Sequence, residues 1–531
     1  GNLTSNSEPL LIGAETDGGD IVRPFSGDIE EVAIWDRALE NHEIADIVRA
    51  TTLHTSSAQM LHYKHPAHAV GDVHPYFEDG VYYVTYLYNP GIWNVAQIRS
   101  TDLLHWDWYD LTHTPVTGGQ LLPNYFVLDV IRDPSINKYR TYYGYAGTRT
   151  SVSEDLLHWD FGVPHLVMPD SYTLYDRQSD PFVFWNEDEN KYWMVQTLRK
   201  KNLPPSQAGA VGYAVANTPT SWAFQGELYF PGDRGDPECP SMFKMGDQWY
   251  LLASYFDRAV GKPSYRYSSN PRGPRNTPFP DSLDGKDLCA AISCENDTTR
   301  LLFGWIPLTP SQPGSQYWGG HLAFPREVYR IAGSETLGTR LETTIGEQIR
   351  GPLQFPAGSE TLLGRAGIWS INGNEAICLS TSGYNVATIS GLSDRIDLEL
   401  RLTPNTGCQR AGAILDWSPS SAGLEVGVDV VNSRFLIQTP GGLVHSEIPI
   451  EMSPLNRPNI LRVIVEGNIV EAFLDDRYSL AARVPLTIQT SVVGLFSQGG
   501  PVLFENVNLF YLNGLNELPD IVSSVPQWAL Y

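Results

Sequence analysis

Short apolar runs, each placed behind a polar turn, recur along the middle of the chain. Five of them are dominated by aromatic and β-branched residues, which favour half-buried strands. The runs are GVYYVTYLY from residue 80, NKYRTYYGY from 137, NKYWMVQTL from 190, DQWYLLASY from 247 and TRLLFGWIP from 299. Their successive starts lie 57, 53, 57 and 52 residues apart. This pattern predicts an all-β fold built from one repeated unit.

A second motif repeats with the same period. STDLLHWDW at residues 100–108 returns as SEDLLHWDF at 153–161, an offset of 53 residues. A period of about 50 residues is typical of β-propeller blades. We therefore predict a five-bladed β-propeller over residues 60–335. His105 and His158 occur in both copies, so we assign them to the blade and not to a unique site.

An acidic residue lies eight to twelve residues before each apolar run. A hairpin fits between acid and run, so each acid is expected to begin the innermost strand of its blade. Five such strands would start around the mouth of one central funnel, which predicts a ring of carboxylates there. The acids are Asp72, Asp129, Asp180, Glu238 and Asp287.

The regions that flank the repeat have other patterns. Residues 345–515 alternate apolar and polar positions between short turns, which predicts a β-sandwich domain. Residues 1–55 contain FSGDIEEVAIWDRALENHEIADIV, a strand, a turn and an amphipathic helix similar to the end of a laminin-G or concanavalin-like jelly roll. We expect this short fragment to pack on the rest of the chain. Residues 516–531 are expected to form a tail.

Composition and charge narrow the classes of function. The chain has 531 residues with a formal net charge of −24, which opposes binding to nucleic acid or to an acidic membrane surface. No apolar run is long enough to span a bilayer. The five cysteines show no CxxC pair or zinc spacing, so we expect no metal and no cofactor. A neutral substrate such as a sugar is compatible with this charge.

The same features bear weakly on cysteine pairing and location. Cys289 could pair with Cys294, and Cys378 with Cys408, although single buried thiols are an equal alternative. No leader is recognised at residue 1, so a mature or trimmed form is expected. Glycosylation triplets begin at Asn2 and Asn296. We expect an extracellular protein, whose oligomeric state the sequence leaves open.

An ordered set of motifs resembles glycoside hydrolase family 32, which includes fructan hydrolases and invertases. The likeness spans roughly residues 60 to 515 and leaves the first fifty unexplained. The motifs, in chain order, are GDVHPYFEDGVYYVTYLYNP, STDLLHW, SDPFVFW, PECPSMF, RLLFGWIP, WGGHLAFPREVY and LRVIVEGNIVEAFLDD. The resemblance implies a propeller followed by a sandwich, and an oligo- or polysaccharide substrate such as a fructan or sucrose.

The resemblance also implies roles for three acids. Asp72 falls on the family's nucleophile, Glu238 on its acid/base and Asp180 on its transition-state stabiliser. Retaining hydrolysis needs one ionised carboxyl that attacks the anomeric carbon and one protonated carboxyl that assists the leaving oxygen. A covalent fructosyl-enzyme intermediate is therefore expected.

Several positions depart from the family pattern. The family's Asn before the nucleophile is Gly71, and its Trp-Gly-His-Ala segment is Val95-Ala96-Gln97-Ile98. These changes indicate a divergent member of the family. Candidate substrate contacts are His74, Trp93, Gln97, Asp129, Arg177 and Trp318.

Other functions remain open from the sequence. A fructosyltransferase, or an enzyme that forms a difructose anhydride, would use the same intermediate. A clan-related arabinofuranosidase would cleave with inversion. A non-catalytic carbohydrate-binding protein is a fourth alternative.

Two Asp-Pro motifs compete for the stabiliser role. IRDPSINKY carries the family's Arg-Asp-Pro at Asp133, whereas SDPFVFW places Ser179 before Asp180. The blade count selects Asp180, because it starts the third blade. We expect Arg177 to supply the missing guanidinium from two positions upstream of Ser179.

Overall fold

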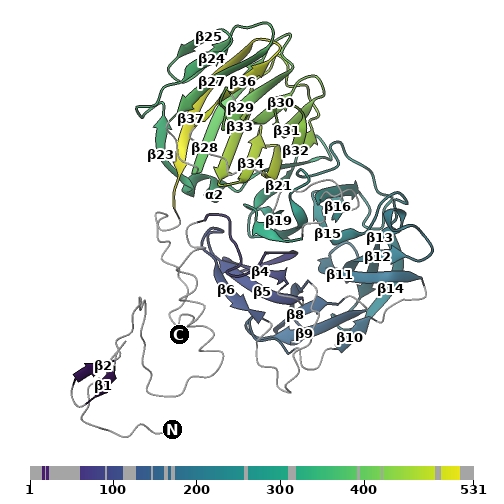
Figure 1. Cartoon of the computed structure of the whole chain (residues 1–531). Coiled ribbons are helices and arrows are strands. Elements are labelled where there is room, and N and C mark those ends of the chain that lie inside the picture. The colour runs from purple at the N-terminus through teal and green to yellow at the C-terminus, as the bar shows by residue number, and fades with distance from the viewer. Residues whose placement is uncertain are drawn as a thin grey trace.

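The structure is a computed structural model that describes residues 15–17, 20–22, 60–89, 93–111, 127–144, 147–160, 165–168, 174–255, 261–308, 318–390, 395–419, 423–484 and 492–514. Within these residues the chain forms a five-bladed propeller followed by a two-sheet sandwich, as predicted (Figure 1). The jelly-roll-like strand and helix expected before residue 55, and the tail from 516, lie outside the described residues.

Each blade of the propeller is one antiparallel sheet. The first two blades are β3 (Val73–Glu78), β4 (Val81–Tyr88), β5 (Asn94–Ser100) and β6 (Asp107–Asp110), then β7 (Asp129–Asp133), β8 (Lys138–Tyr143), β9 (Thr148–Ser153) and β10 (His165–Met168). The third is β11 (Tyr175–Asn186), β12 (Lys191–Lys200), β13 (Gly209–Ala216) and β14 (Trp222–Tyr229). The fourth is β15 (Pro237–Met245), β16 (Gln248–Tyr255) and β17 (Lys262–Ser268). The fifth is β18 (Cys289–Glu295), β19 (Arg300–Pro307), β20 (Gly320–Leu322), β21 (Arg326–Arg330) and β22 (Leu337–Leu341). The fifth blade thus extends past residue 335.

The apolar runs form the second strand of each blade, and their polar turns explain why. Gly80, Asn137, Asn190 and Gly246 have φ of 80°, 54°, 50° and 63°. Glycine and asparagine tolerate this left-handed region, which tight hairpin turns require. In the turn between β3 and β4, Asp79 also has a positive φ of 52°, as expected of an Asp-Gly hairpin.

The ring of blades closes with the segment before β3. Val70 pairs with Gly320, and Lys64 pairs with His321, so the start of the propeller adds to β20 of the last blade. β18 and β3 also lie against one another. The last blade is therefore fastened to the first by backbone pairing.

The sandwich contains an eight-stranded and a seven-stranded sheet. The first comprises β23 (Arg350–Phe355), β25 (Trp369–Asn372), β26 (Glu375–Cys378), β28 (Arg395–Pro404), β33 (Asn459–Glu466), β34 (Ile469–Leu474), β35 (Tyr478–Arg483) and β37 (Val502–Leu512). The second comprises β24 (Leu363–Ala366), β27 (Tyr384–Ser390), β29 (Arg410–Leu415), β30 (Leu424–Asp429), β31 (Arg434–Thr439), β32 (Leu443–Pro449) and β36 (Val492–Gln498). Alternate residues of both sheets build one apolar core between them.

Three short elements complete the description: the helix α2 (Thr343–Gln348), the 3-10 turn η2 (Pro205–Gln207) and a hairpin of β1 (Glu15–Asp17) and β2 (Asp20–Val22). In the part of the chain that the structure describes, no helix is both long and apolar enough to cross a membrane. The five cysteines are free thiols, so neither of the two disulfides considered is present.

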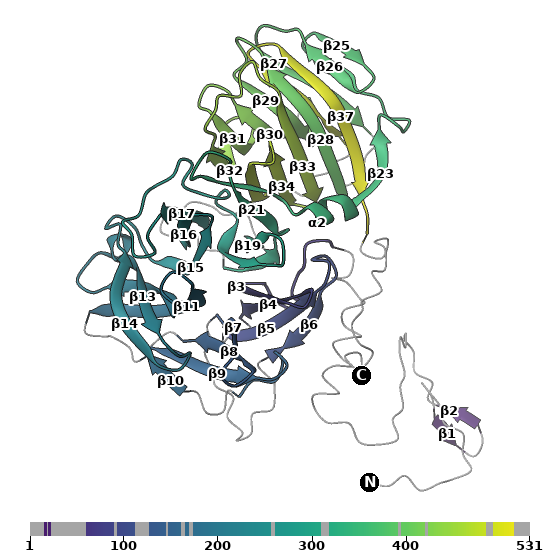
Figure 2. The same cartoon turned by 180° about the vertical axis from the view of Figure 1, so that it is seen from behind.

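The sandwich stands beside the last blade of the propeller, next to β19 and β21 (Figures 1 and 2). Buried hydrogen bonds join the two domains. Asp284 accepts from the Ser479 hydroxyl at 2.7 Å and from the Ala481 amide at 2.8 Å, while Glu471 accepts from the Phe324 amide at 2.9 Å. These bonds fix the sandwich to one side of the ring of blades.

Candidate active site

Three predicted acids approach one another at the same end of the innermost strands. Asp72 directly precedes β3, Asp180 lies within β11, and Glu238 is the second residue of β15. Asp180 is 3% exposed. The charges of Asp72 and Asp180 each affect the pKa of Glu238. The blade architecture therefore brings together carboxyls that are far apart in sequence.

The pairing of the innermost strands is irregular beside Asp180 and Glu238, which changes the direction of their side chains. The register between first and second strands shifts between Ser179 and Phe182, and again between Glu238 and Ser241. Asp180 and Cys239 have φ of 53° and 47° at these shifts. Such β-bulges are common beside active sites because they redirect a side chain, and positive φ at non-glycine residues costs of order 1–3 kcal/mol.

The bulges correct the predicted ring of five equivalent acids. Asp180 is itself the residue with positive φ in β11, whereas Glu238 precedes the corresponding residue, Cys239. The two acids therefore do not occupy the same position in their strands. Asp287 departs further, because its Oδ2 accepts the backbone amide of Arg483 from the sandwich at 2.9 Å. Its carboxylate takes part in the domain interface.

Asp180 is held as a carboxylate. Its Oδ2 accepts hydrogen bonds from Arg177 at 3.1 Å and from the Thr197 hydroxyl at 3.0 Å, and it lies 3.4 Å from the Cys239 amide. Burial by itself raises the pKa of Asp180, but the Arg177 charge and these hydrogen bonds hold it below its ordinary value. Asp180 is thus ionised at neutral pH.

Arg177 donates hydrogen bonds to acids of both the third and the fourth blade. Its Nη1 donates to Glu238 Oε1 at 2.5 Å and to Asp236 Oδ2 at 2.9 Å, and its Nη2 donates to Glu238 Oε2 at 2.7 Å. Its Nε donates to the Ser179 hydroxyl at 2.7 Å. The guanidinium therefore points toward Asp180 and the site, in agreement with the hypothesis that it replaces the family's adjacent arginine.

Burial raises the pKa of Glu238 to about 8. The Arg177 charge pulls this pKa down, while the charges of Asp180 and Asp72 push it up. Arg177 carries one positive charge and faces the carboxyls of Asp72, Asp180 and Glu238, so the site favours keeping a proton on one of them. Glu238 is the group that keeps it near neutral pH.

Asp72 has a pKa between those of the other two acids. Burial raises it to about 6, and the neighbouring charge of Asp180 adds to the rise. A hydrogen bond from the indole Nε1 of Trp305 to Asp72 Oδ1, at 3.2 Å, acts in the opposite direction. Asp72 is therefore largely ionised above about pH 6, where Glu238 is still protonated.

His74 and Asp129 lie beside one another in the first two blades. His74 Nδ1 is 3.6 Å from Asp129 Oδ1, and Asp129 Oδ2 accepts the Val183 amide at 2.6 Å. Asp129 thus joins the second blade to the third. Both side chains are buried, His74 at 3% and Asp129 at 5% exposure, and their role as sugar contacts stays a prediction.

Three tryptophans form a wall next to Asp72. The Trp318 ring packs edge-on against Trp93 with centroids 4.6 Å apart, and it lies 6.3 Å from the Trp305 ring. A Cβ added to Gly71 would come within 1.9 Å of the Trp318 ring. The indole therefore fills the space that any side chain at position 71 would need.

Gln97 is directed elsewhere than predicted. Its Nε2 donates to the Leu156 carbonyl at 3.1 Å, and its Oε1 accepts from Arg99 at 3.2 Å. It is fully buried. The amide joins the first blade to the DLLHW segment of the second, because its strand turns that face toward the neighbouring blade.

Four residues of the site were missed from the sequence: Thr197, Asp236, Arg199 and Trp305. Arg199 forms an ion pair with Asp236, which also accepts a hydrogen bond from Arg177. A signal existed for Trp305, since the other four blades carry a hydroxyl near the same strand position: Thr85, Thr141, Thr197 and Ser254. Within the described residues, no cluster of His, Cys, Asp and Glu is suited to a metal ion.

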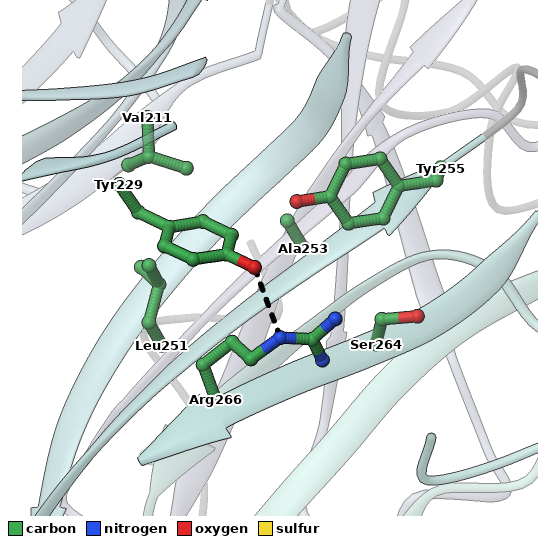
Figure 3. A pocket seen from close by; sticks show the side chains of 7 residues that line it. All are labelled: Val211, Tyr229, Leu251, Ala253, Tyr255, Ser264 and Arg266. Carbon is green, nitrogen blue, oxygen red and sulfur yellow. Dashed lines mark hydrogen bonds between the residues drawn. The ribbon is translucent and has the colours of Figure 1, made fainter. Parts of the chain in front are cut away.

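A separate hollow lies between the third and fourth blades (Figure 3). Its empty volume is about 200 Å³, which includes space open to solvent. The Tyr229 hydroxyl accepts from Arg266 Nε at 3.1 Å across it. None of the candidate acids lines the hollow, so we interpret it as a packing gap. The lining residues are Val211, Tyr229, Leu251, Ala253, Tyr255, Ser264 and Arg266.

Comparisons with known proteins agree with this geometry. Residues 149–338 match the model of the glycosyl hydrolases family 32 N-terminal domain. Among curated proteins, none matches the chain.

Solved structures share the whole architecture. The chain is similar to the β-fructofuranosidase of Aspergillus kawachii with a TM-score of 0.65, 15% identity, and coverage of 93% of this chain and 100% of that one. It is similar to the exo-inulinase of Aspergillus awamori with a TM-score of 0.64, 15% identity, and coverage of 87% and 99%. It is also similar to fructan 1-exohydrolase IIa of Cichorium intybus, with a TM-score of 0.63, 14% identity, and coverage of 86% and 98%.

At these identities the solved structures establish the fold, while the family match covers most of the propeller. The match over residues 149–338 and the shared fold are consistent with a divergent member of glycosyl hydrolase family 32.

Proposed function

We propose that the chain is a retaining glycoside hydrolase that cleaves β-fructofuranosyl linkages in fructans or sucrose through a covalent fructosyl-enzyme intermediate. The observation that carries the proposal is a cluster of three carboxyls with separated pKa values. The pKa of Asp180 is lowered, that of Asp72 is about 6 and that of Glu238 is about 8. Separate pKa values are how two acids in one site take opposite roles. The substrates named for the similar inulinase and fructan exohydrolase support this substrate class.

The reaction assigns one step to each acid. An oxygen of Asp72 attacks the anomeric carbon of the fructosyl unit while Glu238 protonates the departing glycosidic oxygen. Glu238, now ionised, then removes a proton from water, and the resulting hydroxide displaces Asp72 with net retention. Asp180 accepts hydrogen bonds from the fructosyl hydroxyls, which tighten as positive charge develops on the ring.

Arg177 has a part in the proton transfers. Its contact with both Glu238 oxygens means that one oxygen must leave the guanidinium before it can reach the glycosidic oxygen. Its charge then stabilises the Glu238 carboxylate that exists between the two steps. Arg177 is therefore expected to set the pH at which Glu238 loses its proton.

The first experiment measures products and their configuration. Purified protein is incubated with sucrose, inulin and levan, and released fructose is followed by chromatography and by NMR of the first-formed anomer. Retention is expected, whereas inversion would contradict the mechanism and favour the arabinofuranosidase type. Fructose transferred to a sugar would identify a fructosyltransferase. Absence of any fructose-containing product from all three substrates would overturn the proposal.

The pH dependence of kcat/KM tests the roles of the acids. Activity requires ionised Asp72 and protonated Glu238, so it should rise through about pH 6 and fall through about pH 8. Asp72→Asn should lower kcat by roughly 10³-fold or more. Asp79→Asn is the matched control, because it makes the same change in the exposed turn at the far end of the β3–β4 hairpin. Equal rates for these two variants would remove Asp72 from its role.

A further inference from the structure

A residue near the end of the second strand touches an inner strand in every blade. In four blades this residue has a hydroxyl that hydrogen-bonds to the backbone of the same or the next blade. A residue that repeats in this way serves the blade itself. The bonds join Thr85 to the Leu128 carbonyl at 3.0 Å, Thr141 to the Asp129 carbonyl at 2.9 Å, Thr197 to the Pro237 carbonyl at 2.7 Å and Ser254 to the Ala291 amide at 3.1 Å.

The fifth blade breaks the pattern. Trp305 of β19 pairs with Cys289 of the inner strand β18, as Ser254 pairs with Glu238 in the blade before. Its indole Nε1 donates to the side-chain oxygen Oδ1 of Asp72 at 3.2 Å, across the closure from the last blade to the first. The hydroxyls of the other blades bond to backbone groups, and that of Thr197 also lies 3.0 Å from Asp180 Oδ2. The longer indole of Trp305 instead reaches the side chain of Asp72 in the neighbouring blade.

Packing fixes the direction of this N–H. Trp305 is fully buried, and the Trp318 ring lies against it at 6.3 Å with an angle of 56° between the planes. Trp318 is held in turn by Trp93 and by the bare backbone of Gly71. An indole N–H can only donate and cannot rotate like a hydroxyl. It therefore offers one donor along one fixed direction.

We propose that Trp305 is a positioning residue for the nucleophile: its N–H occupies Oδ1 of Asp72 and so directs Oδ2 toward the anomeric carbon. The proposal rests on the function proposed above, since it needs Asp72 to be the attacking group. A carboxylate with one oxygen fixed loses its rotational freedom before substrate arrives, which lowers the entropy cost of attack. The same hydrogen bond favours the ionised form that attack requires.

The test removes the N–H and keeps an aromatic ring. Trp305→Phe should lower kcat by about 10- to 100-fold, the value of one hydrogen bond to a charged group, and leave KM nearly unchanged. It should also move the acid limb of the kcat/KM profile to higher pH, because the hydrogen bond lowers the pKa of Asp72. A role confined to packing would not move this limb.

Trp193→Phe is the matched control. Trp193 is also fully buried on the second strand of a blade, in β12, away from Asp72. Its variant should keep the pH profile of the unaltered protein. Trp305→His, which retains a ring N–H, should recover part of the lost kcat at a pH where the imidazole is neutral.

Each outcome bears on one proposal. The positioning role is overturned if Trp305→Phe keeps both kcat and the pH profile. It is also overturned if Trp305→His and Trp305→Phe lose kcat equally and neither moves the acid limb. If Asp72→Asn leaves turnover intact, the proposed nucleophile fails instead. Loss of turnover in Asp72→Asn beside an unaffected Trp305→Phe would reject the inference alone. Thermal unfolding of all variants identifies any that fail to fold. If Trp305→Phe fails to fold, the kcat and pH profile of Trp305→His test the proposal instead.

Discussion

Asp133 and Asp180 both precede a proline on the innermost strand of a blade, Asp133 in β7 and Asp180 in β11. Asp133 ends its strand at the outer turn, where its Oδ1 accepts the Ser135 amide at 3.0 Å and its Oδ2 accepts Arg140 Nε at 2.8 Å. Asp180 lies at the opposite, bulged part of its strand and bonds to Arg177. One aspartate shapes a turn and the other belongs to the site.

The comparison shows that the neighbouring arginine is a poor guide to the site. Asp133 has the family's Arg-Asp-Pro sequence, yet the arginine beside it, Arg132, bonds to Asn137 at 2.8 Å in the turn. Asp180 lacks an adjacent arginine but receives Arg177 from three residues upstream, because the register shift between Tyr175 and Arg177 turns that side chain toward the site. Position along the strand therefore decides the role of the Asp-Pro pair.

The largest expected difference between the two acids is in catalysis. Asp180→Asn removes the carboxylate that would face developing positive charge, so kcat should fall by about 10²- to 10³-fold. The rate of fructose release under saturating substrate measures the change. Asp133→Asn is the same substitution in the neighbouring blade, and an equal loss of kcat in both variants would contradict the distinction.

The two arginines should differ in their effect on the pH profile. Arg177→Gln removes a charge that lowers the pKa of both Glu238 and Asp72, so both limbs of the kcat/KM profile should move to higher pH. Activity near neutrality should fall by about 10- to 100-fold through the lost charged hydrogen bonds. Arg140→Gln, beside Asp133, should leave both limbs in place. A profile unchanged in Arg177→Gln would show that the guanidinium does not act on the two acids.

The smallest effect on turnover is expected from Asp133→Asn, whose cost lies in stability. Loss of the Arg140 pair should reduce the free energy of unfolding by about 2 kcal/mol at neutral pH. Its hydrogen bonds hold the pKa of Asp133 below the ordinary value despite burial, so the native carboxylate stabilises the fold above the unfolded pKa. That contribution disappears as the pH falls through the lowered pKa, and the difference from the unaltered protein should shrink in acid. Urea unfolding at two pH values measures this, and a constant difference would contradict it.

Much of the fold could be predicted because it depends on local patterns. The aromatic runs and the turn residues Gly80, Asn137, Asn190 and Gly246 mark the hairpins directly. The 50-residue period then gives the propeller, and strict alternation after it gives the sandwich. The end of the last blade could not be predicted, because β21 pairs with β19, and β22 with β21, outside the repeated pattern.

The candidate site was only partly predictable. The order of Asp72, Asp180 and Glu238 follows from the motifs, and the structure brings the three together. Gln97 and Asp287 were placed in the site although the structure directs them to Leu156 and Arg483. Sequence alternation shows that a side chain is inward on its strand, but not which neighbouring blade or domain it meets.

The sequence by itself determined the strands, the turns and the number of blades, and it carried the resemblance to glycoside hydrolase family 32, because these depend on residues close together in the chain. Only the tertiary structure decided which acid meets which partner. Trp305 reaches Asp72 across 233 positions and Arg177 reaches Glu238 across 61. Such contacts depend on bulges that shift each strand by a residue and on the closure of the ring, and neither leaves a periodic trace in the sequence.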